Sequence, residues 1–107
     1  MTKYIFIESR DPFESRDTSF IAETASSLKL RGHDVTVFLL QNGVFAARNS
    51  PHSLAQLTDK GITVLADDFS LKERGMENLE LARGIQQAPI DKLVDALVEE
   101  NTRAIWH

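Results

Sequence analysis

The stretch Thr58–Gly75, TDKGITVLADDFSLKERG, decides how the rest of the sequence is interpreted. Its Ile62–Ala66 segment is a short apolar run bounded by turn residues, which predicts a buried strand. Asp67 and Asp68 follow directly at the carboxyl end of that strand. In an open α/β sheet, ligands bind beyond this end of the strands, so the two adjacent carboxylates are the most suggestive chemistry in the sequence.

The segments before this stretch predict two parallel strands joined by a helix. Lys3–Glu8, KYIFIE, is an apolar run of strand length, and Val35–Leu40, VTVFLL, is typical of a strand covered on both faces. A helix is expected between them, beginning at Asp17 or Thr18 and ending at Gly32, with its apolar residues on one face. A strand, a helix and a second strand in this order form a crossover unit with a parallel pair.

Two shorter helices are expected on either side of the third strand. Ser50 as N-cap and Pro51 at the first helical position predict one helix before it. Ser70 and Glu73 have the spacing of a capping box, which predicts a second helix that Gly75 stops after about one turn.

The remaining sequence completes a layered α/β pattern. Met76–Arg83 is compatible with helix or loop, Gly84–Ala88 predicts a short fourth strand, and Arg103–Trp106 predicts a terminal strand. Pro89 opens a helix whose apolar residues share one face, namely Ile90, Leu93, Val94, Leu97 and Val98. The order predicts a three-layer α/β/α sandwich around a mostly parallel sheet of about five strands, in a single domain over residues 1–107.

Composition excludes several classes of function. The formal net charge is −4, which disfavours nucleic acid as a partner because phosphate binding normally needs a basic face. No apolar run approaches the roughly 20 residues of a membrane span, and the start MTKYIFIESRD lacks the apolar core of a signal peptide, so we expect a cytoplasmic protein without a membrane partner. The sequence contains no cysteine, which removes disulfides, thiolate metal sites and thiol nucleophiles together.

Polar side chains should gather where the predicted strands end. A cleft at the carboxyl edge of the sheet needs several convergent polar groups, although polar loops occur at this edge in every fold of the class. The candidates for such a cleft are Glu8, Arg10, Gln41, Asn42, Asp67 and Asp68.

Two interpretations of Asp67 and Asp68 stay open. They could act as an acid–base or metal-binding pair, but adjacent residues on a strand point to opposite faces, so both serve one site only after the chain has turned. Alternatively, one carboxylate caps the next helix and the other is solvated. His33, His52 and His107 are scattered without metal-ligand spacing, and no glycine-rich nucleotide loop is present, so we predict no metal site and no cofactor.

Several motifs together resemble a known family. They are IFIES near the start, RGHDV (Arg31–Val35) followed by FLLQNGVFAA, Gly61-Ile62 entering a strand, Glu73-Arg74-Gly75, and LVDALVEENTRAIW at the end. In this order and spacing the sequence resembles the DsrE/DsrF-like family, which includes the TusD-type sulfur-relay proteins. The resemblance implies a small α/β domain that assembles into trimers or hexamers.

The resemblance also marks one departure. Active sulfur-relay members carry a persulfide on a cysteine just after the third strand, shortly before an Arg-Gly pair. Counting back from Arg74-Gly75 places that position at about Asp67. A carboxylate cannot accept and pass on sulfane sulfur as a thiolate does, so the fold carries over and the activity does not.

Two hypotheses of function follow. The first is a non-catalytic or ligand-binding oligomeric relative of the sulfur-relay proteins, or an accessory subunit beside a thiol-bearing sulfur-transfer partner. The second is an enzyme of unknown reaction that uses Asp67, Asp68 and Glu8 as acid–base groups at the sheet edge. The absence of cysteine favours the first hypothesis.

Overall fold

The computed structural model describes residues 2–11, 18–50 and 54–107. Within these residues, one five-stranded sheet has the order β4-β3-β2-β1-β5, and every neighbouring pair of strands is parallel. The strands are β1 (Lys3–Glu8), β2 (Asp34–Leu39), β3 (Thr63–Asp67), β4 (Gln86–Ala88) and β5 (Thr102–Trp106). All five predicted strands are therefore confirmed, and the mostly parallel sheet of the prediction is wholly parallel.

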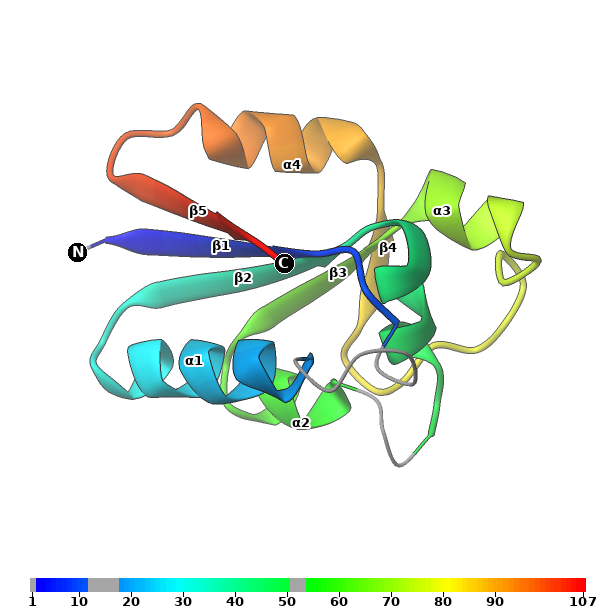
Figure 1. Cartoon of the computed structure of the whole chain (residues 1–107), viewed down its shortest axis with the longest axis horizontal. Helices are drawn as coiled ribbons and strands as arrows, with labels where there is room; N and C mark the ends of the chain where they lie inside the picture. Colours follow the sequence, from blue (N-terminus) through cyan, green and yellow to red (C-terminus); the bar gives the residue numbers. More distant parts are fainter. Residues whose placement is uncertain (1, 12–17, 51–53) are drawn as a thin grey trace.

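Helices cover the sheet on both faces (Figure 1). The helices are α1 (Thr18–Leu30), α2 (Ala55–Asp59), α3 (Asp68–Glu73) and α4 (Ile90–Leu97), with a 3-10 segment η1 (Gln41–Ala47) after β2. Figure 1 places α1 and α2 along one face of the sheet and α4 along the other, so the three-layer sandwich is confirmed. None of the helices in the described residues has the length and apolar character needed to cross a bilayer.

Two apolar clusters, one on each face of the sheet, hold these layers together. The larger cluster lies under α1 and α2 and includes Phe6, Ile21, Val37 and Leu57, all fully buried. The smaller cluster lies under α4 and includes Ile5, Ile7, Phe38 and Leu93. Burial of apolar side chains on both faces explains why the strand sequences are continuous apolar runs rather than alternating ones.

Alternation along the strands decides which face each terminal side chain occupies. Ile7 belongs to the cluster under α4, so the next residue, Glu8, faces the α1 layer. Ala66 belongs to the cluster under α1 and α2, so the next residue, Asp67, faces the α4 layer. The two acids that end β1 and β3 therefore lie on opposite faces of the sheet.

The start of α3 differs from its prediction. Ser70 was expected as the N-cap, but the helix begins at Asp68 and its N-cap is Asp67. Both residue types cap helices well, and the choice between them depends on where the strand ends. Gly75, with φ +69°, follows α3 as predicted.

Two other helical predictions have different outcomes. The helix expected from Ser50 and Pro51 begins at Ala55 in the structure, and Pro51 lies outside the described residues. Between Met76 and Arg83 the chain forms a loop, which is fixed to η1 by the backbone bond from Ala82 N to Ala47 O (2.8 Å). This loop leads into β4 on the edge of the sheet.

Candidate functional site

Asp67 is a buried helix cap. Its Oδ2 accepts hydrogen bonds from the backbone N–H of Ser70 (3.0 Å) and from the Ser70 hydroxyl (2.7 Å), and the residue is only 4% exposed. Its other oxygen, Oδ1, is buried and has no hydrogen-bond partner among the described residues. Asp68 is exposed on the first turn of α3. The two adjacent carboxylates therefore have different roles, as the capping hypothesis expected: Asp67 caps α3 and Asp68 is exposed to solvent.

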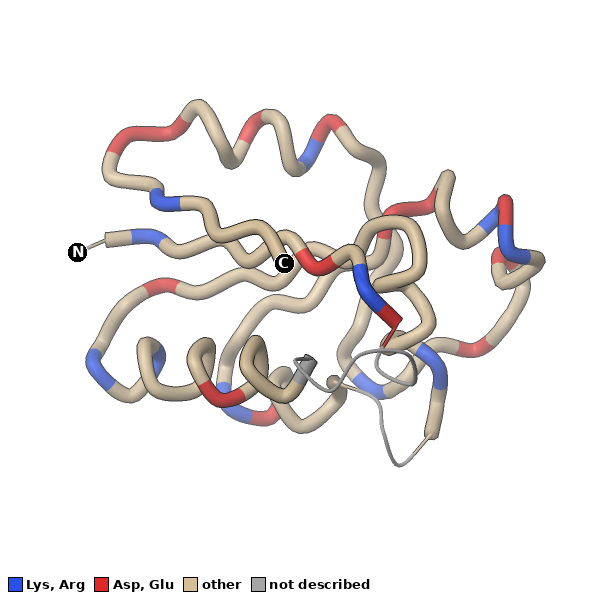
Figure 2. The backbone as a smooth tube through the Cα atoms, viewed as in Figure 1, with Lys and Arg blue, Asp and Glu red and all other residues tan. Residues whose placement is uncertain are grey.

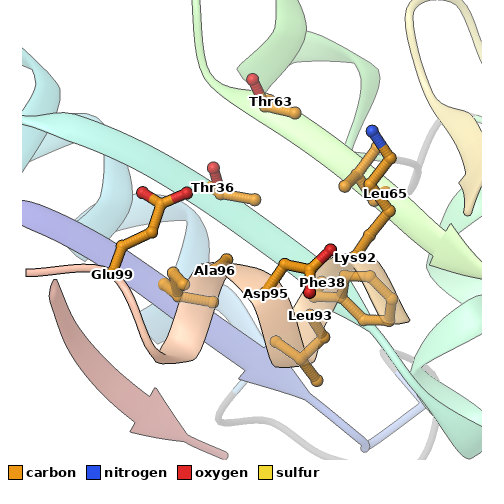
Figure 3. Close-up of a pocket in the computed structure, with 10 residues that line it drawn as sticks. Thr36, Phe38, Thr63, Leu65, Lys92, Leu93, Asp95, Ala96 and Glu99 are labelled. Carbon is orange, nitrogen blue, oxygen red and sulfur yellow. The ribbon is translucent and has the colours of Figure 1, made fainter. Parts of the chain in front are cut away.

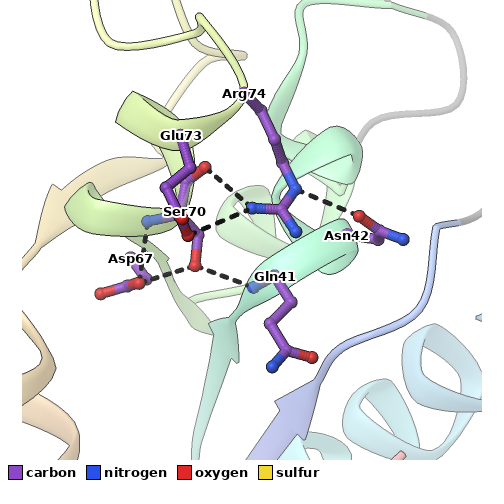
Figure 4. Close-up of polar contacts among 6 residues, drawn as sticks. All are labelled: Gln41, Asn42, Asp67, Ser70, Glu73 and Arg74. Atoms are coloured by element: carbon purple, nitrogen blue, oxygen red, sulfur yellow. Dashed lines mark hydrogen bonds and ion pairs between the residues drawn. The ribbon is translucent and has the colours of Figure 1, made fainter.

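Ser70 connects this cap to the segment that follows β2. The backbone N–H of Gln41 donates to the Ser70 hydroxyl oxygen at 2.9 Å, and the hydroxyl in turn donates to Asp67 (Figure 4). Gln41 has φ +49°, a left-handed conformation that is uncommon for a residue other than glycine. The Gln41 side chain points away from this chain of hydrogen bonds (Figure 4). The start of η1 and the end of β3 are thus joined through one serine.

Arg74 closes the same cluster from the far end of α3. Its Nε donates to Asn42 Oδ1 at 3.1 Å, and its Nη1 donates to the backbone carbonyl of Ser70 at 3.2 Å. Nη1 also lies 3.9 Å from a carboxylate oxygen of Glu73, which is more exposed. Figure 4 shows these side chains converging between α3 and η1. The cluster therefore links one cation, Arg74, to the buried Asp67 cap through Ser70.

Glu8 forms a second, separate group. Its carboxylate is buried and accepts a hydrogen bond from the backbone N–H of Arg10 (2.9 Å), while Nδ1 of His107 lies 2.8 Å from its other oxygen. The backbone N–H of Ser9 also bonds the His107 carbonyl at 2.9 Å. These contacts join the end of β1 to the end of β5, two strands away from β3.

The six predicted site residues thus fall into three places. Gln41, Asn42 and Asp67 gather around Ser70 and Arg74, whereas Glu8 and Arg10 gather with His107 on the other face of the sheet. Asp68 joins neither group by a contact that the structure records.

Three contributors were missed as site residues by reasoning from the sequence. In the sequence, Ser70 was recognised only as a helix cap, and Arg74 only as part of an Arg-Gly pair. His107 is brought to Glu8 by the β1–β5 pairing, in which Ile7 lies opposite Trp106. Nothing in the residue spacing alone indicates which strand lies beside β1.

One opening beside α4 is distinct from both groups. A cavity of about 370 Å³ lies between α4 and the sheet, with Thr36, Phe38, Thr63 and Leu65 on the strands below it (Figure 3). None of the six predicted site residues lines this cavity. In the described part of the chain, no group of three or more acidic or histidine side chains is arranged to hold a metal ion.

The family can now be assigned. The family model described as "DsrE/DsrF-like family" matches residues 2–103. The chain belongs to this family. No curated protein sequence matches the chain.

Solved structures agree with the family assignment at the level of the fold. The crystal structure of the ychN protein from E. coli has a TM-score of 0.82 and 19% sequence identity, covering 98% of this chain and 100% of that one. The protein of unknown function MTH1491 from Methanobacterium thermoautotrophicum has a TM-score of 0.81 and 19% identity, with both chains fully covered. At this identity the likeness establishes a shared fold and not a shared activity.

In this family member, Asp67, the last residue of β3, is a structural carboxylate. The Asp67 oxygen that Ser70 holds cannot leave its two donors without weakening the start of α3. The cluster as a whole joins η1, β3 and α3 by hydrogen bonds, and Arg74 supplies its positive charge.

Proposed function

We propose that this chain is a non-catalytic or ligand-binding, oligomeric relative or accessory subunit of the sulfur-relay proteins, and that it cannot carry a persulfide itself. The observation that carries the proposal is the role of Asp67. It stands where the family resemblance expects the sulfur-carrying cysteine, and it serves as the buried cap of α3. The whole sequence offers no thiol elsewhere.

The chemistry of sulfur transfer supports this proposal. A persulfide forms when a thiolate attacks a sulfane sulfur and keeps it in an S–S bond, and an aspartate has no sulfur with which to form that bond. A strand, a helix cap and a helix are still formed around this position, and in the proposed role this framework supports the binding of a ligand or a partner subunit in place of sulfur transfer.

The alternative, an enzyme that uses Asp67, Asp68 and Glu8 together, has less support. Asp67 and Glu8 face opposite sides of the sheet, and Asp68 is exposed on α3. Acid–base catalysis at one substrate needs both groups within hydrogen-bond reach of the same reacting atoms. Carboxylates that point in three directions do not meet that requirement.

A sulfur-loading assay tests the proposal. The purified chain is incubated with a cysteine desulfurase and its persulfide donor, and labile sulfur is measured by mass spectrometry before and after reduction. We expect the parent to gain no sulfur, while an exposed thiol in the variant Asp68→Cys gains reducible sulfur and shows that the assay works. Reductant-sensitive sulfur bound to the parent in stoichiometric amount contradicts the proposal.

A further inference from the structure

The cavity between α4 and the sheet has the size of a small-molecule site. Its volume is about 370 Å³. Helix α4 lies along this face of the sheet (Figure 1) and packs through Leu93 on Ile5 and Phe38, which belong to β1 and β2. Toward β3 the sheet presents the small side chains of Thr36 and Thr63, which leave the space beside the helix open. The cavity is therefore a consequence of where α4 packs and of which side chains the strands carry.

The lining of this cavity is apolar on the sheet and charged on the helix. Phe38 and Leu65 supply an apolar floor from β2 and β3. Lys92, Asp95 and Glu99 have the spacing i, i+3 and i+7, which puts them on one side of α4 and its C-terminal extension. Figure 3 shows these three side chains along the opening, above the strands. Small-molecule sites typically combine an apolar surface with a few placed polar groups in this way.

Two of the three charges are unpaired. Glu99 is occupied, because its carboxylate lies 2.6 Å from Nζ of Lys3. Lys92 and Asp95 form no hydrogen bond or ion pair through their side chains, either with each other or with any other of the described residues. Residues three apart on a helix have Cβ atoms about 5–6 Å apart. One unpaired cation and one unpaired anion thus lie side by side above an apolar floor.

This combination favours one class of ligand over others. A simple anion would be attracted by Lys92 and repelled by Asp95, and a simple amine would meet the reverse. A purely apolar molecule would use the floor alone. A small zwitterion offers an anionic group to Lys92 and a cationic group to Asp95, and charge-assisted hydrogen bonds of this kind are the strong ones. If the same molecule has an apolar side chain, that side chain can cover Phe38 and Leu65.

We propose that the cavity between α4 and the sheet binds a free α-amino acid with an apolar side chain. The carboxylate of the ligand pairs with Lys92, its ammonium group pairs with Asp95, and its side chain lies on Phe38 and Leu65. The inference rests on the ligand-binding role in the proposed function, for which it names a site and a ligand class. The site is separate from the cluster around Asp67, which does not line the cavity.

An NMR titration of the backbone amide shifts with L-leucine and three analogues tests the ligand class. Leucinamide lacks the carboxylate, N-acetyl-leucine lacks the ammonium group, and glycine lacks the apolar side chain. We expect leucine to bind, and each analogue to bind at least about tenfold more weakly, because each leaves one part of the site unmatched. No binding of leucine at millimolar concentration overturns the proposal. An analogue that binds as tightly as leucine overturns the proposed ligand class.

Two substitutions assign each charge of the ligand to its side chain. Lys92→Gln removes the partner of the carboxylate, so this variant should bind leucine and leucinamide equally. Asp95→Asn removes the partner of the ammonium group, so this variant should bind leucine and N-acetyl-leucine equally. Lys72→Gln and Asp91→Asn are the matched controls, because they change exposed charges that do not line the cavity, and both should bind leucine as the parent does. If either cavity variant keeps the preference of the parent, its side chain does not hold the ligand and the proposal is wrong.

Filling the cavity tests where the ligand binds. Thr63→Trp adds a large side chain from β3, and Ala96→Leu adds a larger one from α4, at two residues that line the opening. We expect both variants to lose leucine binding while circular dichroism shows that they are folded. A folded variant that binds leucine as the parent does overturns the proposal, as do leucine-induced shifts around Asn42 and Arg74 in place of α4 and β3. If a filled variant does not fold, the Lys92 and Asp95 variants decide the question.

The result is independent of the sulfur-loading assay, in which this cavity has no part. Absence of leucine binding overturns the present inference and leaves the inability to carry a persulfide standing. Uptake of reducible sulfur by the parent overturns that part of the proposed function, whatever the leucine titration shows.

Discussion

The Oδ2 atom of Asp67 accepts two hydrogen bonds from one residue, Ser70, through its backbone N–H at 3.0 Å and its hydroxyl at 2.7 Å. This double contact fixes the carboxylate at the start of α3 and links it through Ser70 to Gln41. It also gives one oxygen of this buried carboxylate two donors, which offsets part of the cost of burying it at the end of β3, while Oδ1 has no hydrogen-bond partner among the described residues.

The first prediction separates capping from a binding role for Asp67. Asp67→Asn keeps an oxygen acceptor for Ser70 and should lower the free energy of unfolding by a few tenths of a kcal/mol, whereas Asp67→Ala removes the cap and should lower it by about 1 kcal/mol. Urea unfolding measures both values. Equal losses in the two variants, or a stabilising shift by divalent metals that only the parent shows, would contradict the cap as the residue's sole role.

The second prediction concerns Arg74, which holds α3 against η1. Arg74→Met removes the donors to Asn42 Oδ1 and to the Ser70 carbonyl and should lower the free energy of unfolding by about 1–2 kcal/mol. Arg83→Met is the matched control, because its ion pair with Asp59 is exposed on both sides and should contribute less than about 0.5 kcal/mol. Similar losses in the two variants would show that the Arg74 contacts add nothing beyond a surface charge pair.

The strands could be predicted from the sequence because continuous apolar runs on a parallel sheet leave few alternatives. Val35–Leu40 and Lys3–Glu8 gave strands within one residue of the observed bounds. The start of α3 could not be decided this way, since Asp67 and Ser70 are both good caps. What decides it is tertiary: the Ser70 hydroxyl is held by the backbone of Gln41, 29 residues earlier in the chain.

The sequence could predict the edge of the sheet at which the candidate residues lie. It could not predict the face of the sheet on which each side chain lies. The carboxyl ends of the strands do meet at one edge, as expected for a parallel sheet. However, alternation sends Glu8 and Asp67 to opposite faces, and that depends on which residue is last in each strand. A difference of one residue in a strand end is enough to join or separate two such groups.

The third prediction concerns the close approach of η1 to β1. A Cβ atom at Gly43 would overlap the backbone carbonyl oxygen of Glu8, which also accepts a hydrogen bond from the Leu40 N–H at 3.0 Å. Gly43→Ala should therefore move backbone atoms and lower the free energy of unfolding by about 3 kcal/mol. Gly75→Ala meets open space and should cost only about 1 kcal/mol, from its positive φ. If the two variants unfold at the same urea concentration, η1 can shift to accommodate the added methyl group, and the close contact with Glu8 does not contribute to stability.

The last prediction concerns the contact between Glu8 and His107, which ties the edge strand β5 to the central strand β1. Glu8 is buried, and its oxygen lies 2.8 Å from Nδ1 of His107, so removing either partner leaves the other without its contact. In a double-mutant cycle with Glu8→Gln and His107→Ala, we expect a coupling energy of about 1 kcal/mol. The same cycle on the exposed pair Asp59 and Arg83 serves as the control and should give less than about 0.5 kcal/mol. Hydrogen exchange of the β5 amides should be faster in both Glu8→Gln and His107→Ala than in the parent, because the carboxyl end of β5 is then held only by its backbone bonds and by the hydrogen bonds of the Ser9 hydroxyl to Trp106 and to the His107 carbonyl. Additive losses in the Glu8–His107 cycle, with unchanged exchange in β5, would show that the pair is a contact without energetic consequence.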